Sequence, residues 1–140
     1  MDDAFGFDEP ADASGAIATE PEPELFYPTL DDFVREHVRF KYRRLVGRAG
    51  RADLRWKAAW WESEEALSRL ETLWRGWENA RQDPIKMGDW WLNQFDRHMA
   101  VLLSSSGPFA TSQDENKPGD PLPYTPPPPG FFPPTDPALF

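Results

Sequence analysis

Apolar side chains recur every three or four residues between Ser63 and Asp83, which is the period of one face of an α-helix. The stripe consists of Ala66, Leu67, Leu70, Leu73, Trp74 and Trp77. Ser63 suits an N-cap, and Glu64 and Glu65 place negative charge at the positive end of the helix dipole. The residue before a proline is pushed out of the α region, so Asp83-Pro84 predicts the end of this helix.

Two further segments show the same helical period. Thr29 to Asp32 has the form of a capping box, and Gly47 supplies a stop, which predicts a helix over 29–46. A third helix is expected to start at Gly88 and Asp89 and to end at the serines after residue 103. Three amphipathic helices with connectors of ordinary length predict an all-α fold, a small three-helix bundle.

The apolar faces of these three helices form the expected core. Its members are Phe33, Val34, Val38, Leu45, Leu70, Leu73, Trp74, Trp77, Leu92, Phe95, Met99 and Leu102. A folded part of roughly 80 residues supports one core of marginal stability, so large apolar side chains are needed inside.

The composition of the two ends differs from that of the middle. Residues 1–28 hold eight acidic and no basic side chains, and residues 113–140 hold ten of the sixteen prolines. Such segments bury too little apolar surface to offset the entropy of ordering, so we expect a helical domain over 25–112 between disordered tails at 1–24 and 113–140. Pro126 to Pro129 favour polyproline II, which is either a stiff spacer or a ligand for an aromatic-lined groove.

Several kinds of chemistry find no support in the sequence. The absence of cysteine excludes disulfides, thiolate metal sites and cysteine nucleophiles. Neither a phosphate-binding glycine loop nor an HExxH motif occurs. His37 and His98 are single helical histidines without a catalytic partner at a suitable spacing. We therefore expect no enzyme activity, no catalytic residue, no cofactor and no metal.

The start of the chain is acidic and lacks the basic and apolar regions of a secretory signal. No run approaches the ~18 apolar residues that a membrane-spanning helix needs. We expect a cytoplasmic protein without a membrane span.

Arginine recurs at four-residue spacing in the first predicted helix, at Arg35, Arg39 and Arg43, so the three side chains share one face. This basic stripe has three interpretations. It is a solvated face, a contact for nucleic-acid phosphates, or a dock for an acidic protein surface, which includes this chain's own tail.

Trp56, Trp60 and Trp61 lie in the connector at 48–62, off any periodic apolar face. One interpretation packs these rings between the connector and the bundle. The other exposes them to a protein partner or to stacked nucleic-acid bases. Together with the basic stripe, they are the candidate partner-binding residues.

One ordered series of motifs resembles a known family. The series is Phe26-Tyr27, Trp60-Trp61, Glu65-Ala66, Arg69-Leu70, Leu73-Trp74, Trp77-Glu78, Trp91, His98-Met99 and Gly107-Pro108-Phe109. It is similar to domain-of-unknown-function family 4913 of actinobacteria and their plasmids, over residues 25–109. The family has no established activity. Its members are often encoded near conjugation and mobile-element genes, so the resemblance implies by association an accessory role in DNA transfer.

These observations favour a non-enzymatic helical adaptor that presents an aromatic and basic surface to a larger protein, with the tails as additional contacts. The alternative is a nucleic-acid-binding accessory protein that uses the basic stripe and the neighbouring tryptophans. The sequence specifies neither the identity of the partner nor the oligomeric state.

Overall fold

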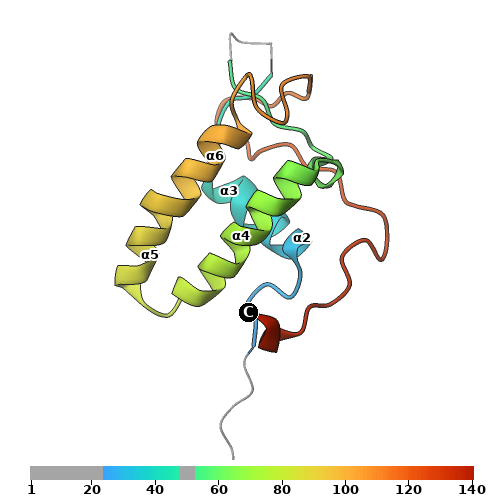
Figure 1. Ribbon diagram of the computed structural model, residues 1–140. Coiled ribbons are helices and arrows are strands. Elements are labelled where there is room, and N and C mark those ends of the chain that lie inside the picture. The colour runs from blue at the N-terminus through green and yellow to red at the C-terminus, as the bar shows by residue number, and fades with distance from the viewer. Residues whose placement is uncertain (1–23, 48–52) are drawn as a thin grey trace, which may run out of the picture.

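Three helical segments make up the framework of the protein, as the computed structural model of the 140-residue chain shows (Figure 1). The structure describes residues 24–47 and 53–140, and within these ranges it contains no strand. The all-α prediction is confirmed. The acidic tail predicted over 1–24 lies outside the described residues except for Glu24. No helix within the described ranges is long and apolar enough to cross a membrane.

The first helical segment joins α2 (Leu30–Phe33), a π-helical turn (Val34–Val38) and α3 (Arg39–Lys41). Its capping box is confirmed, because the Thr29 hydroxyl accepts from the Asp32 amide while the Asp32 carboxylate accepts from the Thr29 amide.

The predicted end of this helix at residue 46 is wrong. Tyr42 leaves the helical conformation, with φ −118° and ψ 62°. The reason lies far along the chain: the Val46 amide donates to Asn116 Oδ1 over 2.9 Å, and Asn116 Nδ2 donates to the Arg44 carbonyl over 2.9 Å. Backbone groups that another helical turn would use are bonded to Asn116 instead.

Helix α4 (Glu64–Ala80) begins where the sequence predicts. The Ser63 hydroxyl accepts a hydrogen bond from the Ala66 amide over 3.1 Å, and a short 3₁₀ turn (Trp60–Glu62) leads into it. Glu78 near its end is buried, and its carboxylate accepts hydrogen bonds from the Phe26 and Tyr27 amides. This carboxylate ties the chain before α2 to α4.

The third helical segment joins α5 (Pro84–Trp90), a π-helical turn (Trp91–Phe95) and α6 (Asp96–Leu102). It begins four residues before the predicted start at Gly88. Asp83 accepts from the Ile85 amide as N-cap, and Pro84 occupies the first turn, where its missing N–H costs nothing. The Asp83-Pro84 pair therefore ends one helix and starts the next.

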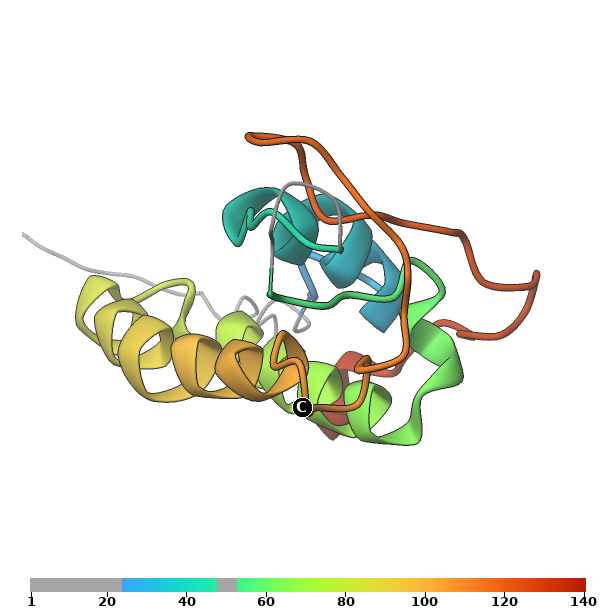
Figure 2. The same ribbon diagram turned by 90° about the horizontal axis from the view of Figure 1, so that it is seen from above.

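Helix α4 and the third helical segment lie next to one another and run in opposite directions (Figure 1). The first helical segment lies across one face of this pair (Figures 1 and 2). The core fills the space between these two layers. Nine of the predicted core residues are buried there: Phe33, Val34, Val38, Leu70, Leu73, Trp74, Phe95, Met99 and Leu102.

Three predicted core residues differ. Trp77 and Leu45 are half-buried, Trp77 against the core and Leu45 beyond the end of the first helix. Leu92 is 67% exposed, and Trp90, which was not predicted, is fully buried instead. The π-helical turn explains the exchange, because it adds a residue to the turn and puts Trp90 and Phe95 on one face.

Residues 113–140, here called the strap, return along the outside of the helices (Figure 1). This differs from the expected disordered proline-rich tail, and the folded part does not end at 112. Leu122 is fully buried, and Tyr124 and Phe132 pack against the core. These side chains offset the entropy of ordering, which the prolines already reduce in the unfolded chain.

Candidate protein-binding site

The three tryptophans of the connector meet the strap. Trp56 is 1% exposed, its indole nitrogen donates to the Pro123 carbonyl over 3.1 Å, and its ring packs against Phe109. Trp60 is fully buried, and its ring stacks on Phe132 with centroids 5.5 Å apart. Of the two interpretations of these rings, burial matches packing and contradicts exposure, because Trp56 and Trp60 are both covered, in part by the chain's own strap.

Trp61 is half-buried and also faces the strap. Its indole nitrogen donates to the Thr125 carbonyl over 3.0 Å, and its ring lies 5.4 Å from that of Phe131. The conformation of the connector follows from these contacts over its described part, residues 53–62. The connector has no regular secondary structure over 53–57, turns at 58–59 and ends in the 3₁₀ turn at Trp60–Glu62. It contacts the strap at Ala58, whose amide donates to the Asp114 carboxylate and whose carbonyl accepts from the Thr125 amide.

The basic stripe is also engaged within the chain. Arg35 forms ion pairs with Asp31, Asp32 and Glu36 at 2.8–3.1 Å. These pairs leave the interpretation of a freely solvated face unsupported for this side chain.

Arg39 and Arg43 bind the strap itself. Arg39 Nε donates to the Leu122 carbonyl over 3.0 Å, and Arg43 Nη1 donates to the Gly119 carbonyl over 2.7 Å. The Arg39 guanidinium also lies 5.4 Å from the centroid of the Tyr124 ring. Of the three interpretations of the stripe, docking of the chain's own tail is the one these contacts match, although carbonyls rather than acids are the acceptors.

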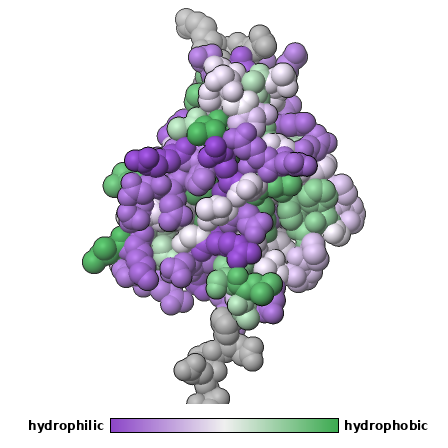
Figure 3. Space-filling model, in the orientation of Figure 1, coloured by the Kyte–Doolittle hydropathy of each residue, from purple (hydrophilic) through white to green (hydrophobic). Residues whose placement is uncertain are grey.

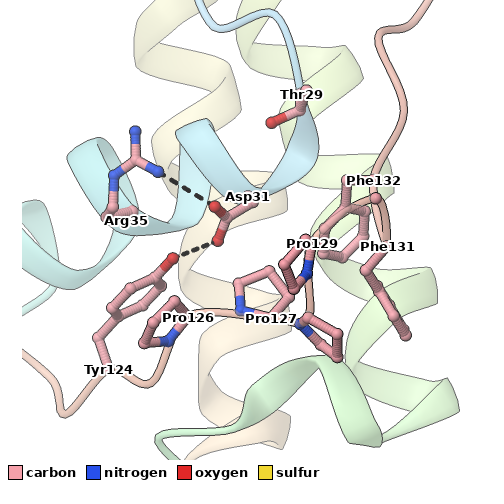
Figure 4. A pocket seen from close by; sticks show the side chains of 11 residues that line it. Thr29, Asp31, Arg35, Tyr124, Pro126, Pro127, Pro129, Phe131 and Phe132 are labelled. Carbon is pink, nitrogen blue, oxygen red and sulfur yellow. Dashed lines mark hydrogen bonds and ion pairs between the residues drawn. The ribbon is translucent and has the colours of Figure 1, made fainter.

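The inner strap, residues 113–125, is held by paired backbone groups. The Leu122 amide donates to the Arg39 carbonyl over 3.1 Å, opposite the bond from Arg39 Nε to the Leu122 carbonyl. Figure 4 shows Tyr124 and Arg35 converging on the carboxylate of Asp31 from two sides. Burial raises the pKa of Tyr124 to about 12, so its hydroxyl keeps the proton that it donates to Asp31.

The outer strap, residues 126–140, continues through the four prolines to Phe131 and Phe132 (Figure 4). A cavity of about 410 Å³ lies between these residues and the start of α2. On the face shown in Figure 3, apolar surface forms separate patches among hydrophilic residues.

We call the surface beneath the strap the groove. Its side chains and backbone groups come from the first helical segment, the connector and α4: Leu30, Arg39, Arg43, Trp56, Ala58, Trp60, Trp61, Leu67, Trp74 and Arg75. Two indole N–H groups and three guanidinium groups donate to strap carbonyls. A proline-rich segment has few N–H groups but a full set of carbonyl acceptors, so this donor-rich, aromatic groove matches it chemically.

Sequence reasoning found both halves of this site but did not join them. The aromatic connector and the PxxP segment at 126–129 were separate observations, and their complementarity in one chain was the available signal. The residues that hold the inner strap, Asp114, Asn116 and Leu122, carry no motif that would reveal their role.

The two histidines are placed in structural surroundings. His37 is buried among the rings of Phe33, Trp77 and Trp90. Burial, aided by the positive charge of Lys41, lowers the pKa of His37 to about 4. His98 lies on α6 with Nδ1 3.1 Å from Arg69 Nη1. Among the described residues, no group of three His, Asp or Glu side chains is arranged to hold a metal ion.

Comparison with known proteins assigns the domain. No curated protein and no solved structure matches the chain. A family model described as "Domain of unknown function (DUF4913)" matches residues 27–128, which include all three helical segments and the inner strap. The chain therefore belongs to the DUF4913 family.

Proposed function

We propose that this protein is a non-enzymatic helical adaptor that binds a larger protein through the groove. The observation that carries the proposal is the set of hydrogen bonds from groove side chains to the carbonyls of an extended segment. Trp61 and Arg39 supply two of them, over 3.0 Å each. Donors that address main-chain carbonyls are suited to a peptide ligand, because every residue of a peptide offers that acceptor.

Part of the groove is built into the fold of the domain, which reduces the entropy cost of binding. Trp60 belongs to the core cluster and the Arg39 backbone lies in the first helical segment, so neither backbone has to be ordered when a ligand replaces the strap. Aromatic and arginine side chains are the residue types that dominate binding energy at protein interfaces. From the association of the family with conjugation genes, we extend the proposal to an accessory role in that machinery.

The adaptor proposal is tested by affinity capture from a lysate of the source organism with the full-length chain as bait. We expect a specific protein to be enriched, and we expect the variant R39A/W61A to lose at least about tenfold of that enrichment. The control is I85A/L92A, since Ile85 and Leu92 are 85% and 67% exposed on the helix from 84 to 102. Equal enrichment by wild type and R39A/W61A, or no enriched protein, would contradict the proposal.

Nucleic-acid binding stays a prediction, and one surface feature favours it as a second candidate. Lys41, Arg43 and Arg44 are exposed close in sequence to the partly exposed Phe40, whose ring the Arg43 guanidinium approaches to 5.4 Å. Basic side chains beside an exposed ring can contact phosphates and stack on a base. Arg35 and Arg39 would have to exchange their present partners to join such a site.

Titration of the full-length chain with single-stranded and duplex DNA at several salt concentrations tests this second candidate. Phosphate-driven binding weakens steeply as salt rises, and the double variant K41A/R44A should reduce the slope of that dependence. I85A/L92A again serves as the control. If no binding is measurable at low salt, the nucleic-acid prediction fails.

A further inference from the structure

The inner and outer parts of the strap are attached in different ways. The inner strap, 113–125, pairs its backbone with Arg39 and Ala58 and buries Leu122 completely. Among the described residues, no backbone hydrogen bond joins the outer strap, 126–140, to the helices. Its one hydrogen bond to them within those residues runs from Arg75 Nη1 to the Leu139 carbonyl, over 2.8 Å. The outer strap is therefore held chiefly by side chains, whereas the inner strap is also held through its backbone.

Ring contacts supply most of the remaining attachment. Phe132 stacks on Trp60, Phe131 lies against Trp61, and the Phe140 ring meets the Trp74 ring edge-on at 4.6 Å. Phe131 and Phe140 are still 41% and 38% exposed. The outer strap thus places aromatic side chains on tryptophans without burying them fully.

Space remains between the outer strap and the helices. A cavity of about 570 Å³ is lined by Leu30, Leu67 and Trp74 on one side and by strap residues 131–136 on the other. This space opens to the surface, and its volume falls in the range of about 300–1,000 Å³ that is common for ligand sites. This part of the groove accommodates a bulkier occupant than the segment that it now holds.

The family match divides the strap at nearly the same point. It ends at residue 128, so it includes Leu30, Trp60, Trp61 and Trp74 beneath the outer strap but leaves out residues 129–140. The surface beneath the outer strap, which we call the seat, belongs to the domain that defines the family. Most of the outer strap itself lies outside that domain.

We propose that the seat of the outer strap is a docking site for a proline-rich segment of a partner protein that carries adjacent aromatic residues, and that residues 126–140 are its intramolecular competitor. This inference rests on the proposed adaptor function and adds the chemistry of the partner. Prolines present the extended conformation at low entropic cost, and two neighbouring rings reach Trp60 and Trp61 together. A ligand carbonyl takes the place of Leu139 at Arg75.

A partner fits this seat better than a second copy of the chain. A second copy would offer the same segment, gain no new contact, and compete with an attached segment whose effective concentration is in the millimolar range. A partner with larger side chains fills the cavity above Leu30 and Trp74 and gains buried apolar area that the chain's own segment leaves open. This difference in buried apolar area allows a partner segment to displace residues 126–140 from the seat.

The test uses the full-length chain with F131A/F132A, which weakens the competitor by removing its two ring contacts with Trp60 and Trp61. The probe is a fluorescein-labelled synthetic peptide with the sequence of residues 126–140, PPPPGFFPPTDPALF, followed by fluorescence anisotropy. We expect saturable binding to F131A/F132A with a Kd about tenfold or more below that for the wild type, because the wild-type segment competes from within the chain. A peptide with alanine in place of Phe131 and Phe132 should not bind.

Two further variants in the F131A/F132A background keep the result specific. R75A should weaken peptide binding several-fold, since the Leu139 carbonyl of the peptide loses its guanidinium donor and the Phe140 ring loses its cation–π contact. I85A should leave peptide binding unchanged. Thermal melts confirm that each variant is folded.

Absence of saturable binding, equal binding by the alanine peptide, or equal affinity for wild type and F131A/F132A would overturn the inference. A wild-type dimer in light scattering that dissociates in F131A/F132A would overturn it in favour of a second copy. Successful capture of a protein together with a peptide that does not bind would leave the adaptor proposal standing and reject only this one. Peptide binding without any captured protein would reject the adaptor role and the partner segment together, and would leave the site only as the seat of the chain's own residues 126–140.

Discussion

Trp60→Ala is expected to lower the free energy of unfolding by about 3–5 kcal/mol, a large part of the stability of a small domain. The Trp60 ring is fully buried and joins the connector to Phe132 of the strap. Removal of the ring leaves a cavity between the connector and the strap, and no helix or sheet within the described residues joins these two segments. Urea unfolding of the full-length chain, followed by far-ultraviolet circular dichroism, measures the change.

Two matched variants separate packing from other effects. Trp60→Phe keeps an aromatic ring, and Trp60 Nε1 makes no hydrogen bond to any described residue, so this variant should lose much less than Trp60→Ala. Trp61→Ala should lower the free energy of unfolding by only about 1–2 kcal/mol. Trp61 is half-buried, and the substitution removes one hydrogen bond to Thr125. If Trp60→Ala stays within about 1 kcal/mol of the wild type, the buried position of this ring is wrong.

Acidification from pH 7 to pH 5 is expected to lower the free energy of unfolding by about 2 kcal/mol through His37. Burial lowers the pKa of His37 from 6.5 to about 4. Between these two values the unfolded chain binds the proton and the folded chain does not, so stability is complete above the ordinary pKa and falls as the pH drops toward 4.

The surroundings of His37 explain why the charged form is disfavoured. The imidazole lies among aromatic rings, the Tyr27 hydroxyl is 3.3 Å from Nδ1, and Nε2 has no hydrogen-bond partner among the described residues. Lys41 adds like-charge repulsion. A proton placed on this ring would be buried without compensation.

Urea unfolding at several pH values between about 5 and 7 measures this effect in wild type, His37→Phe and His98→Gln. His37→Phe keeps a ring in the aromatic surroundings and should flatten most of the pH dependence. Burial and Arg69 also lower the pKa of His98, so His98→Gln should remove a smaller part of the slope. An unchanged slope in His37→Phe would show that other groups cause it.

The parts of the fold that could be predicted depend on neighbours in the sequence. Thr29 with Asp32 and Ser63 with Ala66 are contacts within one helical turn, and both caps are present as predicted. The missed start at Pro84 was also a local signal, but Asp83-Pro84 was interpreted only as a stop. Leu92 was misplaced because a regular helical period ignores the extra residue of a π-helical turn.

The candidate site was predictable only as an inventory of residues. The sequence pointed to Trp56, Trp60 and Trp61 and to the basic stripe, and all of these except Arg35 are groove residues. What covers them depends on contacts such as Trp56 to Pro123, 67 residues apart. No periodicity or motif connects positions at that separation, so the choice between packed and exposed tryptophans stayed open.

The sequence by itself therefore determined the helical class and the caps of the first two helices, because these features depend on hydrogen bonds within a turn and on the period of apolar residues. Only the tertiary structure decided the role of the strap. Its proline-rich composition predicts disorder when considered alone, and Tyr124 gains its order from Asp31, 93 residues earlier in the chain. A segment with no core of its own is ordered here because a groove supplies the apolar surface and hydrogen-bond donors that the segment lacks.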